Sequence, residues 1–226
     1  LFVTGSVGDN VLTGGAGADT IDGFGGSDAI DGGLGDDRVT YRGSEASLTG
    51  GAGSDTLRLA AAGGITGVDL SVASGVDQTS GDTVTATDFE SLDASVLTAL
   101  QAITVTGSAG ANTITGGAGA DTIDGGSGAD VIAGGQGDDR VSYHGTETSI
   151  GGGTGANTLV LGAVTTVELS NADQTTGDLT AVTGFQNIDA SGLGTPAGVV
   201  VTGSGGINVL TGGAGADTLD GAAGSD

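Results

Sequence analysis

The residues of this chain best suited to chemistry are acidic and amide side chains that recur behind glycine-rich turns. The stretch Gly14 to Asp22 reads GGAGADTID, with glycine at its first, second and fourth positions and Asp19 at its sixth. Glycine permits a positive φ, so the first half of this unit predicts a tight turn. Asp19 lies at the edge of the turn, where its carboxylate can join backbone carbonyls around a hard cation. The pattern therefore points to a cation site.

The second half of the unit predicts a very short strand. Thr20, Ile21 and Asp22 place one apolar residue between two polar residues, which is the period-two pattern of a strand with one buried side chain. Units follow in register at residues 5–13, 14–22, 23–31 and 32–40, again at 107–115, 116–124, 125–133 and 134–142, and again at 203–211 and 212–220.

Some units depart from the pattern. Phe24 replaces the second glycine of the unit at 23–31. The unit at 41–49 has Ala46 at the sixth position, so we expect it to complete a turn without metal; 102 residues later the unit that begins at Tyr143 repeats this plan. Residues 50–58 restore the motif.

The repeated pattern resembles the Gly-Gly-x-Gly-x-Asp-x-apolar-x repeat of the RTX (repeats-in-toxin, haemolysin-type calcium-binding) family. The resemblance implies an all-β fold, a right-handed parallel β-roll or β-solenoid in which each coil uses two motifs. It also implies that Ca²⁺ lies between glycine-rich turns and is shared by turns one coil apart, so that its two side-chain ligands are separated by two motifs.

Pairs with that separation give about seven predicted sites, each with 6–8 oxygen ligands once carbonyls are included. The pairs are Asn10 with Asp28, Asp19 with Asp37, Asp37 with Asp55, Asn112 with Asp130, Asp121 with Asp139, Asp139 with Asn157, and Asn208 with Asp226, and Asp217 holds the same motif position. The turn glycines expected at the metal are Gly15, Gly17, Gly33, Gly35, Gly117, Gly119, Gly135 and Gly137.

The alternative interpretation of these side chains is turn formation without metal, since Asp and Asn stabilise turns on their own. A register kept over ten motifs favours the cation. Aspartates at the ninth motif position are instead expected to be solvated strand residues; they are Asp22, Asp31, Asp124 and Asp220.

The composition excludes several classes of partner. The chain of 226 residues has 28 acidic residues against four arginines and no lysine, a formal charge of −24. Such a chain repels itself unless cations neutralise it, and it lacks the basic patches that nucleic acid and anionic membranes require. It has no Trp, Cys or Met, so its core is predicted to be ladders of aliphatic side chains in a solenoid. No apolar run of about 18 residues predicts a membrane span.

The motifs divide the chain into arrays and spacers. We expect a first array at 1–58, a β-rich spacer at 59–106, a second array at 107–160, a second β-rich spacer at 161–202, and the truncated start of a third array at 203–226. The spacers match each other, as in Asp88-Phe89-Glu90 against Gly184-Phe185-Gln186, and are interpreted as irregular coils of the same solenoid. The chain is expected to be a fragment of a larger repetitive protein with open solenoid ends.

No sequence pattern points to catalysis. The chain lacks His-Glu-x-x-His, Gly-x-Ser-x-Gly and phosphate-loop motifs, and its only histidine, His144, is expected to be a surface residue. We therefore expect no enzyme activity.

The leading hypothesis is a calcium-dependent structural segment of a secreted or cell-surface bacterial RTX protein, such as an adhesin stalk, surface layer (S-layer) or extracellular filament, exported by type I secretion. Its expected partners are further modules of the same chain or identical copies in a homo-oligomer, lattice or filament. One alternative is the C-terminal folding and secretion module of a secreted RTX enzyme. Another is an ice- or carbohydrate-binding surface on an outward threonine ladder of Thr20, Thr56, Thr122, Thr158 and Thr218.

Overall fold

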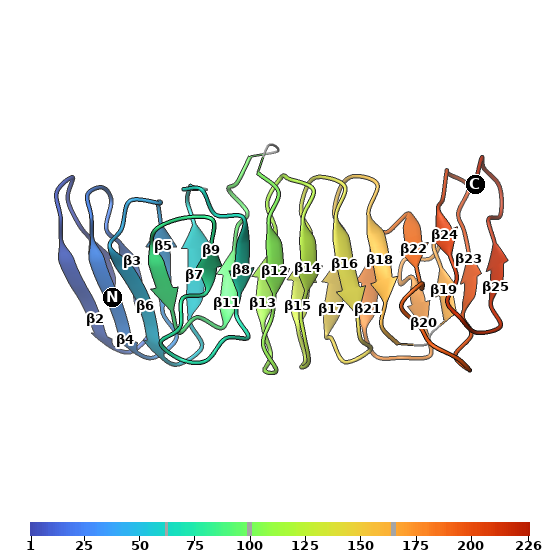
Figure 1. The fold of residues 1–226 in the computed structure, drawn as a ribbon, viewed down its shortest axis with the longest axis horizontal. Coiled ribbons are helices and arrows are strands. Elements are labelled where there is room, and N and C mark those ends of the chain that lie inside the picture. Colours follow the sequence, from blue (N-terminus) through green and yellow to red (C-terminus); the bar gives the residue numbers. More distant parts are fainter. Residues whose placement is uncertain (62, 99–100, 164–165) are drawn as a thin grey trace.

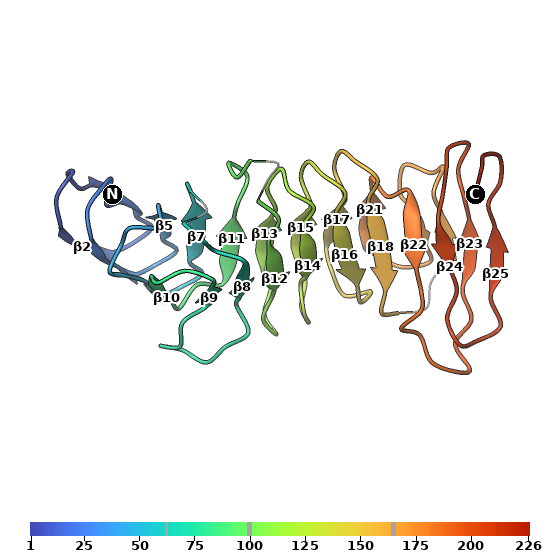
Figure 2. The same ribbon diagram turned by 45° about the horizontal axis from the view of Figure 1, so that its top comes forward.

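The computed structural model describes residues 1–61, 63–98, 101–163 and 166–226. Within these residues all regular structure is β, and the short strands stack into an elongated solenoid of about twelve turns (Figure 1). The predicted all-β solenoid is thereby confirmed. Seen from a second direction, two layers of strands face each other along the whole length of the molecule (Figure 2).

Four sheets make up the two layers. The nine-stranded sheet contains, in spatial order, β1 (Phe2–Thr4), β3 (Thr20–Asp22), β5 (Arg38–Tyr41), β7 (Thr56–Leu59), β11 (Ser91–Asp93), β13 (Thr113–Thr115), β15 (Val131–Ala133), β17 (Ser149–Gly151) and β21 (Ala181–Thr183). The eight-stranded sheet contains β24 (Leu210–Thr211), β22 (Asn187–Asp189), β18 (Thr158–Leu161), β16 (Arg140–Tyr143), β14 (Thr122–Asp124), β12 (Thr104–Thr106), β8 (Gly67–Asp69) and β9 (Thr79–Ser80).

Two shorter sheets complete the layers at the ends. The N-terminal four-stranded sheet contains β10 (Thr85–Thr87), β6 (Ser47–Ala52), β4 (Ala29–Leu34) and β2 (Val11–Ala16). The C-terminal four-stranded sheet contains β20 (Thr175–Thr176), β19 (Thr166–Glu168), β23 (Val200–Thr202) and β25 (Thr218–Asp220).

The strand register shows why two motifs make one coil. Ile21 pairs with Val39, and Val39 pairs with Leu57, in parallel strands two motifs apart. All three side chains are 0% exposed, because the central residue of each strand points between the two layers. Burying one such aliphatic side chain stabilises the fold by about 1.5–3 kcal/mol. The core is therefore mainly a pair of aliphatic ladders, as the composition predicted, and it also contains four buried aromatic side chains, Tyr41, Phe89, Tyr143 and Phe185.

The strands of the first spacer belong to the same sheets as those of the arrays. Leu92 of β11 pairs in parallel with Leu57 of the first array and with Ile114 of the second. The spacers also add antiparallel pairs that the sequence did not predict, β8 with β9 and β19 with β20. Each pair forms the end of a stacked sheet, β8 and β9 next to β12 and β19 and β20 next to β23.

Corresponding strands of the two arrays lie on opposite faces of the solenoid. β3 belongs to the nine-stranded sheet, whereas β14, its counterpart 102 residues later, belongs to the eight-stranded sheet. The first spacer causes this change: the nine-stranded sheet passes through it by β11, while the N-terminal four-stranded sheet ends at β10 and the eight-stranded sheet begins at β9. Each sheet thus overlaps the break in the other layer.

Buried amides hold the spacer turns in the same way in both copies. Gln78 Nε2 donates to the carbonyl of Phe89 at 2.8 Å, and Phe89 N–H donates to Gln78 Oε1 at 2.9 Å. Gln174 and Phe185 form the same reciprocal pair, with distances of 2.7 and 2.8 Å. Each glutamine side chain thus satisfies a backbone N–H and a backbone carbonyl that form no strand-to-strand hydrogen bonds in this irregular part of the chain.

Candidate metal sites

The motif aspartates stack in columns along the two edges of the solenoid, where the chain turns from one layer to the other. Asp37 Oδ1 accepts the backbone N–H of Asp19 at 2.8 Å, and Asp55 Oδ1 accepts that of Asp37 at 2.8 Å. In the second array, Asp139 Oδ1 accepts the N–H of Asp121 at 2.9 Å. One oxygen of each carboxylate therefore fixes the side chain to the coil before it.

The second oxygen of most of these carboxylates has no partner. Asp19, Asp28, Asp37, Asp55, Asp130 and Asp139 each have a buried Oδ2 without a hydrogen bond. A buried carboxylate without a compensating partner is costly, so protein structures pair such a group or coordinate a metal with it. These oxygens are the strongest indication in the structure that a cation belongs between the turns.

The first glycine of each motif shapes the space around that oxygen. A Cβ on Gly14 would overlap both the carbonyl oxygen of Gly32 and Oδ2 of Asp19. In the second array, a Cβ on Gly116 would in the same way overlap the carbonyl oxygen of Gly134 and the carboxylate of Asp121. Carbonyl and carboxylate oxygens from neighbouring coils thus face the same space. This all-oxygen donor set suits Ca²⁺.

Most of the predicted turn glycines have the backbone conformation that requires glycine. Positive φ angles occur at Gly15 (108°), Gly17 (92°), Gly33 (104°), Gly35 (114°), Gly135 (112°) and Gly137 (123°). Gly117 and Gly119 do not have a positive φ. They need glycine for a different reason, since a Cβ would meet the side chain of Leu97 or the backbone of Gln101 in the first spacer.

Phe24 adopts the glycine conformation despite its side chain. Its φ is 72°, and its ring lies 5.6 Å from the guanidinium carbon of Arg42. A positive φ is strained for a bulky residue, so the turn geometry is kept at a cost in backbone energy.

Burial makes four carboxylates of the columns weaker acids. It raises the pKa of Asp139 to about 6, and the neighbouring Asp121 carboxylate adds to this effect. Burial likewise raises the pKa of Asp55 to about 6, together with the charge of Glu90. The pKa values of Asp121 and Asp130 are raised for the same first reason. Such groups favour either a proton or a cation over a bare charge.

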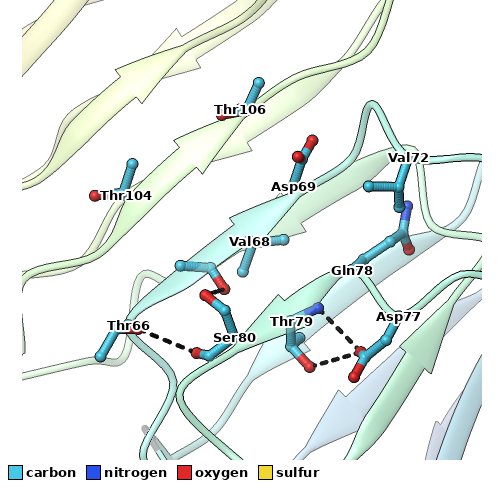
Figure 3. A pocket seen from close by; sticks show the side chains of 11 residues that line it. Thr66, Val68, Asp69, Val72, Asp77, Gln78, Thr79, Ser80, Thr104 and Thr106 are labelled. Carbon is cyan, nitrogen blue, oxygen red and sulfur yellow. Dashed lines mark hydrogen bonds between the residues drawn. The ribbon is translucent and has the colours of Figure 1, made fainter.

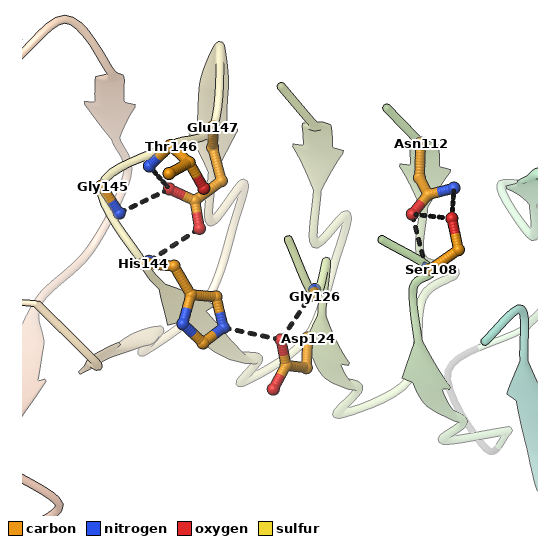
Figure 4. Close-up of polar contacts among 8 residues, drawn as sticks. All are labelled: Ser108, Asn112, Asp124, Gly126, His144, Gly145, Thr146 and Glu147. Carbon is orange, nitrogen blue, oxygen red and sulfur yellow. Dashed lines mark hydrogen bonds and ion pairs between the residues drawn. The ribbon is translucent and has the colours of Figure 1, made fainter. Parts of the chain in front are cut away.

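The asparagines at the start of each array close their turns with hydrogen bonds. Asn112 Oδ1 accepts bonds from the N–H of Ser108 at 2.7 Å and from its Oγ at 3.2 Å (Figure 4). Asn10 with Ser6 and Asn208 with Ser204 make the same contacts. The serine at the second position of these three motifs was the sequence feature that could have predicted these contacts. Calcium binding by the three asparagines stays a prediction.

The structure also shows two buried glutamates, Glu45 and Glu147, whose role in the turns the motif did not predict. Glu147 accepts the backbone N–H groups of His144, Gly145 and Thr146 at 2.7, 2.9 and 3.0 Å (Figure 4). Glu45 accepts the same three bonds in the first array. The units that depart from the motif thus close their turns with a glutamate carboxylate of their own. The sequence signal for this contact was the glutamate at the fifth position of the unit, directly before the position where other units have aspartate.

Two of the aspartates expected to be solvated have specific partners. Asp22 binds the guanidinium of Arg42 through Nε at 2.8 Å and Nη2 at 2.6 Å, and this bond lowers the pKa of Asp22. Asp124 Oδ1 lies 2.8 Å from Nε2 of His144 (Figure 4). His144, which was expected to be a surface residue, is partly exposed and has this specific partner. Asp31 and Asp220 are exposed, as expected.

The threonine ladder is interrupted by arginine. Thr20 and Thr56 both pair with Arg38, which lies between them, and Thr122 and Thr158 flank Arg140 in the same way. The two guanidinium groups bind Asp93 and Asp189 respectively. The outer face thus carries alternating hydroxyl and charged groups instead of the expected row of threonines.

An open groove of about 500 Å³ lies outside the aspartate columns. It crosses β9, β8 and β12, and its lining includes Asp69 and Asp77 (Figure 3). Asp77 Oδ1 accepts bonds from the N–H and Oγ1 of Thr79 at 3.1 and 3.0 Å, and Asp69 Oδ1 accepts bonds from Ser71. Both carboxylates therefore stabilise their own turns.

Two observations concern the described residues as a whole. They contain no group of three or more His, Cys, Asp or Glu side chains that could hold a metal. A site between glycine-rich turns does not need one, because backbone carbonyls supply many of its oxygens. No helix of membrane-spanning length and hydrophobicity occurs in the described part of the chain.

Comparison with known proteins agrees with this geometry. No curated protein matches the chain. Four copies of the RTX calcium-binding nonapeptide repeat match residues 4–39, 47–61, 106–141 and 200–226, which together make up half of its length. The matched segments contain the stacked aspartates and their glycine turns. The chain therefore belongs to the RTX calcium-binding repeat family.

Proposed function

We propose that this chain is a calcium-dependent structural segment of a secreted or cell-surface bacterial protein. Within that class, an adhesin stalk, a surface layer or an extracellular filament fits best. The observation that carries the proposal is the column of buried carboxylate oxygens without partners, which runs along a continuous solenoid. Bound Ca²⁺ would convert these repelling charges into ligands and make the rod rigid.

The overlapping sheets support a structural role. Because β11 joins the nine-stranded sheet of the first array to that of the second, the spacer transmits tension through backbone hydrogen bonds. A flexible linker would not do this. Enzyme-associated modules of this family need only a short array, whereas matched arrays and spacers favour an extended repetitive body. We propose no catalytic activity.

The calcium requirement supports an extracellular location. Sites of modest affinity fill where Ca²⁺ is near millimolar and stay empty in the cytosol, so the chain would fold after export. The proposed partners are further modules of the same chain or identical copies in an oligomer, lattice or filament.

Electron microscopy and small-angle scattering of the purified chain, with calcium and with chelator, test the proposal. About twelve coils at ~4.8 Å each predict a rod roughly 60 Å long. We expect this rod in calcium and an expanded, flexible chain in chelator. Particles of the same shape in both conditions would argue against a calcium-dependent structural role.

A further inference from the structure

The junction between the first array and the first spacer extends the aspartate column beyond the last motif. Within the array, Asp37 N–H donates to Asp55 Oδ1 at 2.8 Å. One coil later, Asp55 N–H donates to Glu90 Oε2 at 2.7 Å. Glu90 lies in the spacer and belongs to no glycine-rich motif, yet its carboxylate takes the position of the next motif aspartate.

The backbone beside Glu90 also reproduces a motif turn. A Cβ on Gly50 would overlap the carbonyl oxygen of Asp88, just as a Cβ on Gly32 would overlap that of Gly50. Asp88 has a φ of 60°, a left-handed conformation that is strained for most residues other than glycine. Its counterpart in the second spacer is Gly184, with a φ of 80°. In this conformation the carbonyl oxygen of Asp88 faces Gly50 at the junction.

Asp55 supplies an oxygen that no group in the described residues satisfies. Its side chain is 0% exposed, and Oδ2 is buried without a hydrogen bond. Burial and the neighbouring charge of Glu90 both raise the pKa of Asp55. Two carboxylates and a carbonyl from adjacent coils therefore meet at this junction, and none of the ion pairs among the described residues involves Asp55 or Glu90.

The second junction has the same backbone with different chemistry. Asn157 replaces Asp55, and Gln186 replaces Glu90. Asn157 N–H donates to Gln186 Oε1 at 2.8 Å, while Asn157 Nδ2 donates to the carbonyl of Gly184 at 2.9 Å. The amide nitrogen thus satisfies the carbonyl that corresponds to that of Asp88. In the first junction a bound cation could satisfy the carbonyl of Asp88, just as the amide of Asn157 satisfies the carbonyl of Gly184 in the second.

We propose that Asp55, Glu90 and the carbonyl of Asp88 bind a calcium ion that fastens the first array to its spacer, whereas the Asn157–Gln186 junction holds without metal. This inference rests on the proposed function only in requiring that the chain binds calcium. It adds a site built from a spacer glutamate, and it makes the two otherwise similar junctions respond differently to calcium depletion.

The number of Ca²⁺ ions bound per chain tests the inference. Glu90→Gln gives the first junction the residue found at the second, and equilibrium dialysis with metal analysis should show one ion fewer than in the unmodified chain. Asp31→Asn removes the same charge from an exposed motif position and is the matched control, with an unchanged count expected. An unchanged count in Glu90→Gln, or an equal loss in both variants, would overturn the inference.

The reciprocal variant gives an independent readout. Asn157→Asp combined with Gln186→Glu should create the carboxylate junction in the second spacer and add one bound ion. If Glu90→Gln does not fold, this variant decides: a gain of one ion supports the inference and no gain overturns it. A chain that binds calcium with the count unchanged in every variant leaves the proposed function standing, whereas an unmodified chain that binds none refutes that function itself.

Discussion

Replacing Asp37 with asparagine should change stability in opposite directions with and without calcium. Asp37 Oδ2 is buried without a partner, and the carbonyl oxygen of Gly50 faces the same space. Asn157 shows what an amide does at this motif position, since its Nδ2 donates to the carbonyl of Gly184 at 2.9 Å. In Asp37→Asn the new amide can make the corresponding bond to Gly50.

The structure sets the size of both effects. Without metal, the variant gains one hydrogen bond, about 1 kcal/mol net, and loses an unpaired buried charge. With calcium it weakens two predicted sites, those shared with Asp19 and with Asp55. At a free ion concentration ten times Kd, each site contributes roughly 1.4 kcal/mol, so the loss is about 3 kcal/mol. For a chain of this size that corresponds to a fall in Tm of about 6–12 °C.

Circular dichroism measures both directions. In saturating calcium, thermal melts should show the lower Tm for Asp37→Asn and no change for Asp31→Asn, an exposed residue with the same charge change. In excess chelator, Asp37→Asn should retain more β signal than the unmodified chain. Equal losses in the two variants in calcium would show that bulk charge is responsible, and a reduced β signal in chelator would refute the role assigned to the amide.

Three further predictions concern the metal, the pH and one strained turn. Excess chelator should unfold the arrays, because seven predicted sites at ten times Kd supply on the order of 10 kcal/mol, comparable to the stability of a whole domain; an unchanged β spectrum and Tm would contradict this. Burial raises the pKa of Asp55 and Asp139 from 3.8 to about 6, so the metal-free fold binds protons more tightly than the unfolded chain. The stability that these two groups contribute is therefore fully present below pH 3.8 and is lost as pH rises through 6, so the β signal in chelator should be larger at pH 4 than at pH 7.5. Phe24→Gly should relieve a positive φ of 72° at a cost of an exposed cation–π contact with Arg42, for a net gain near 1 kcal/mol and a rise in Tm of about 2–4 °C in calcium; a fall in Tm would show that the ring contributes more than the strain costs.

The repeating part of the fold was predictable because one motif determines both turn and strand. The period-two pattern placed side chains such as Ile21 and Val39 inside, where the structure has them. The coil of two motifs, which brings Asp19 next to Asp37, was implied by the resemblance to the RTX repeat. The turns and strands thus followed from local geometry repeated in register, whereas the way they stack followed from the family.

The remaining features depend on contacts that no local pattern contains. The three N–H groups that donate to Glu147 converge only once the turn has formed. Glu90 contacts the aspartate column from a spacer that contains no repeated motif, so no spacing in the sequence predicts the contact. The antiparallel pair of β8 with β9 likewise depends on how the irregular chain folds back. Aligning the sequences of the two spacers shows that they are similar, but it does not show how either spacer folds.

The exchange of faces between the arrays gives the rod an approximate twofold screw symmetry. Strands such as β3 and β14 correspond in sequence but lie in opposite sheets, so each module is turned by half a revolution relative to the one before it. A bend produced by one array is then opposed by the next, and a long chain of such modules stays straight on average. A proposed neighbour that recognised one array face would meet it on alternate sides of the rod, so its lateral contacts would repeat once every two modules.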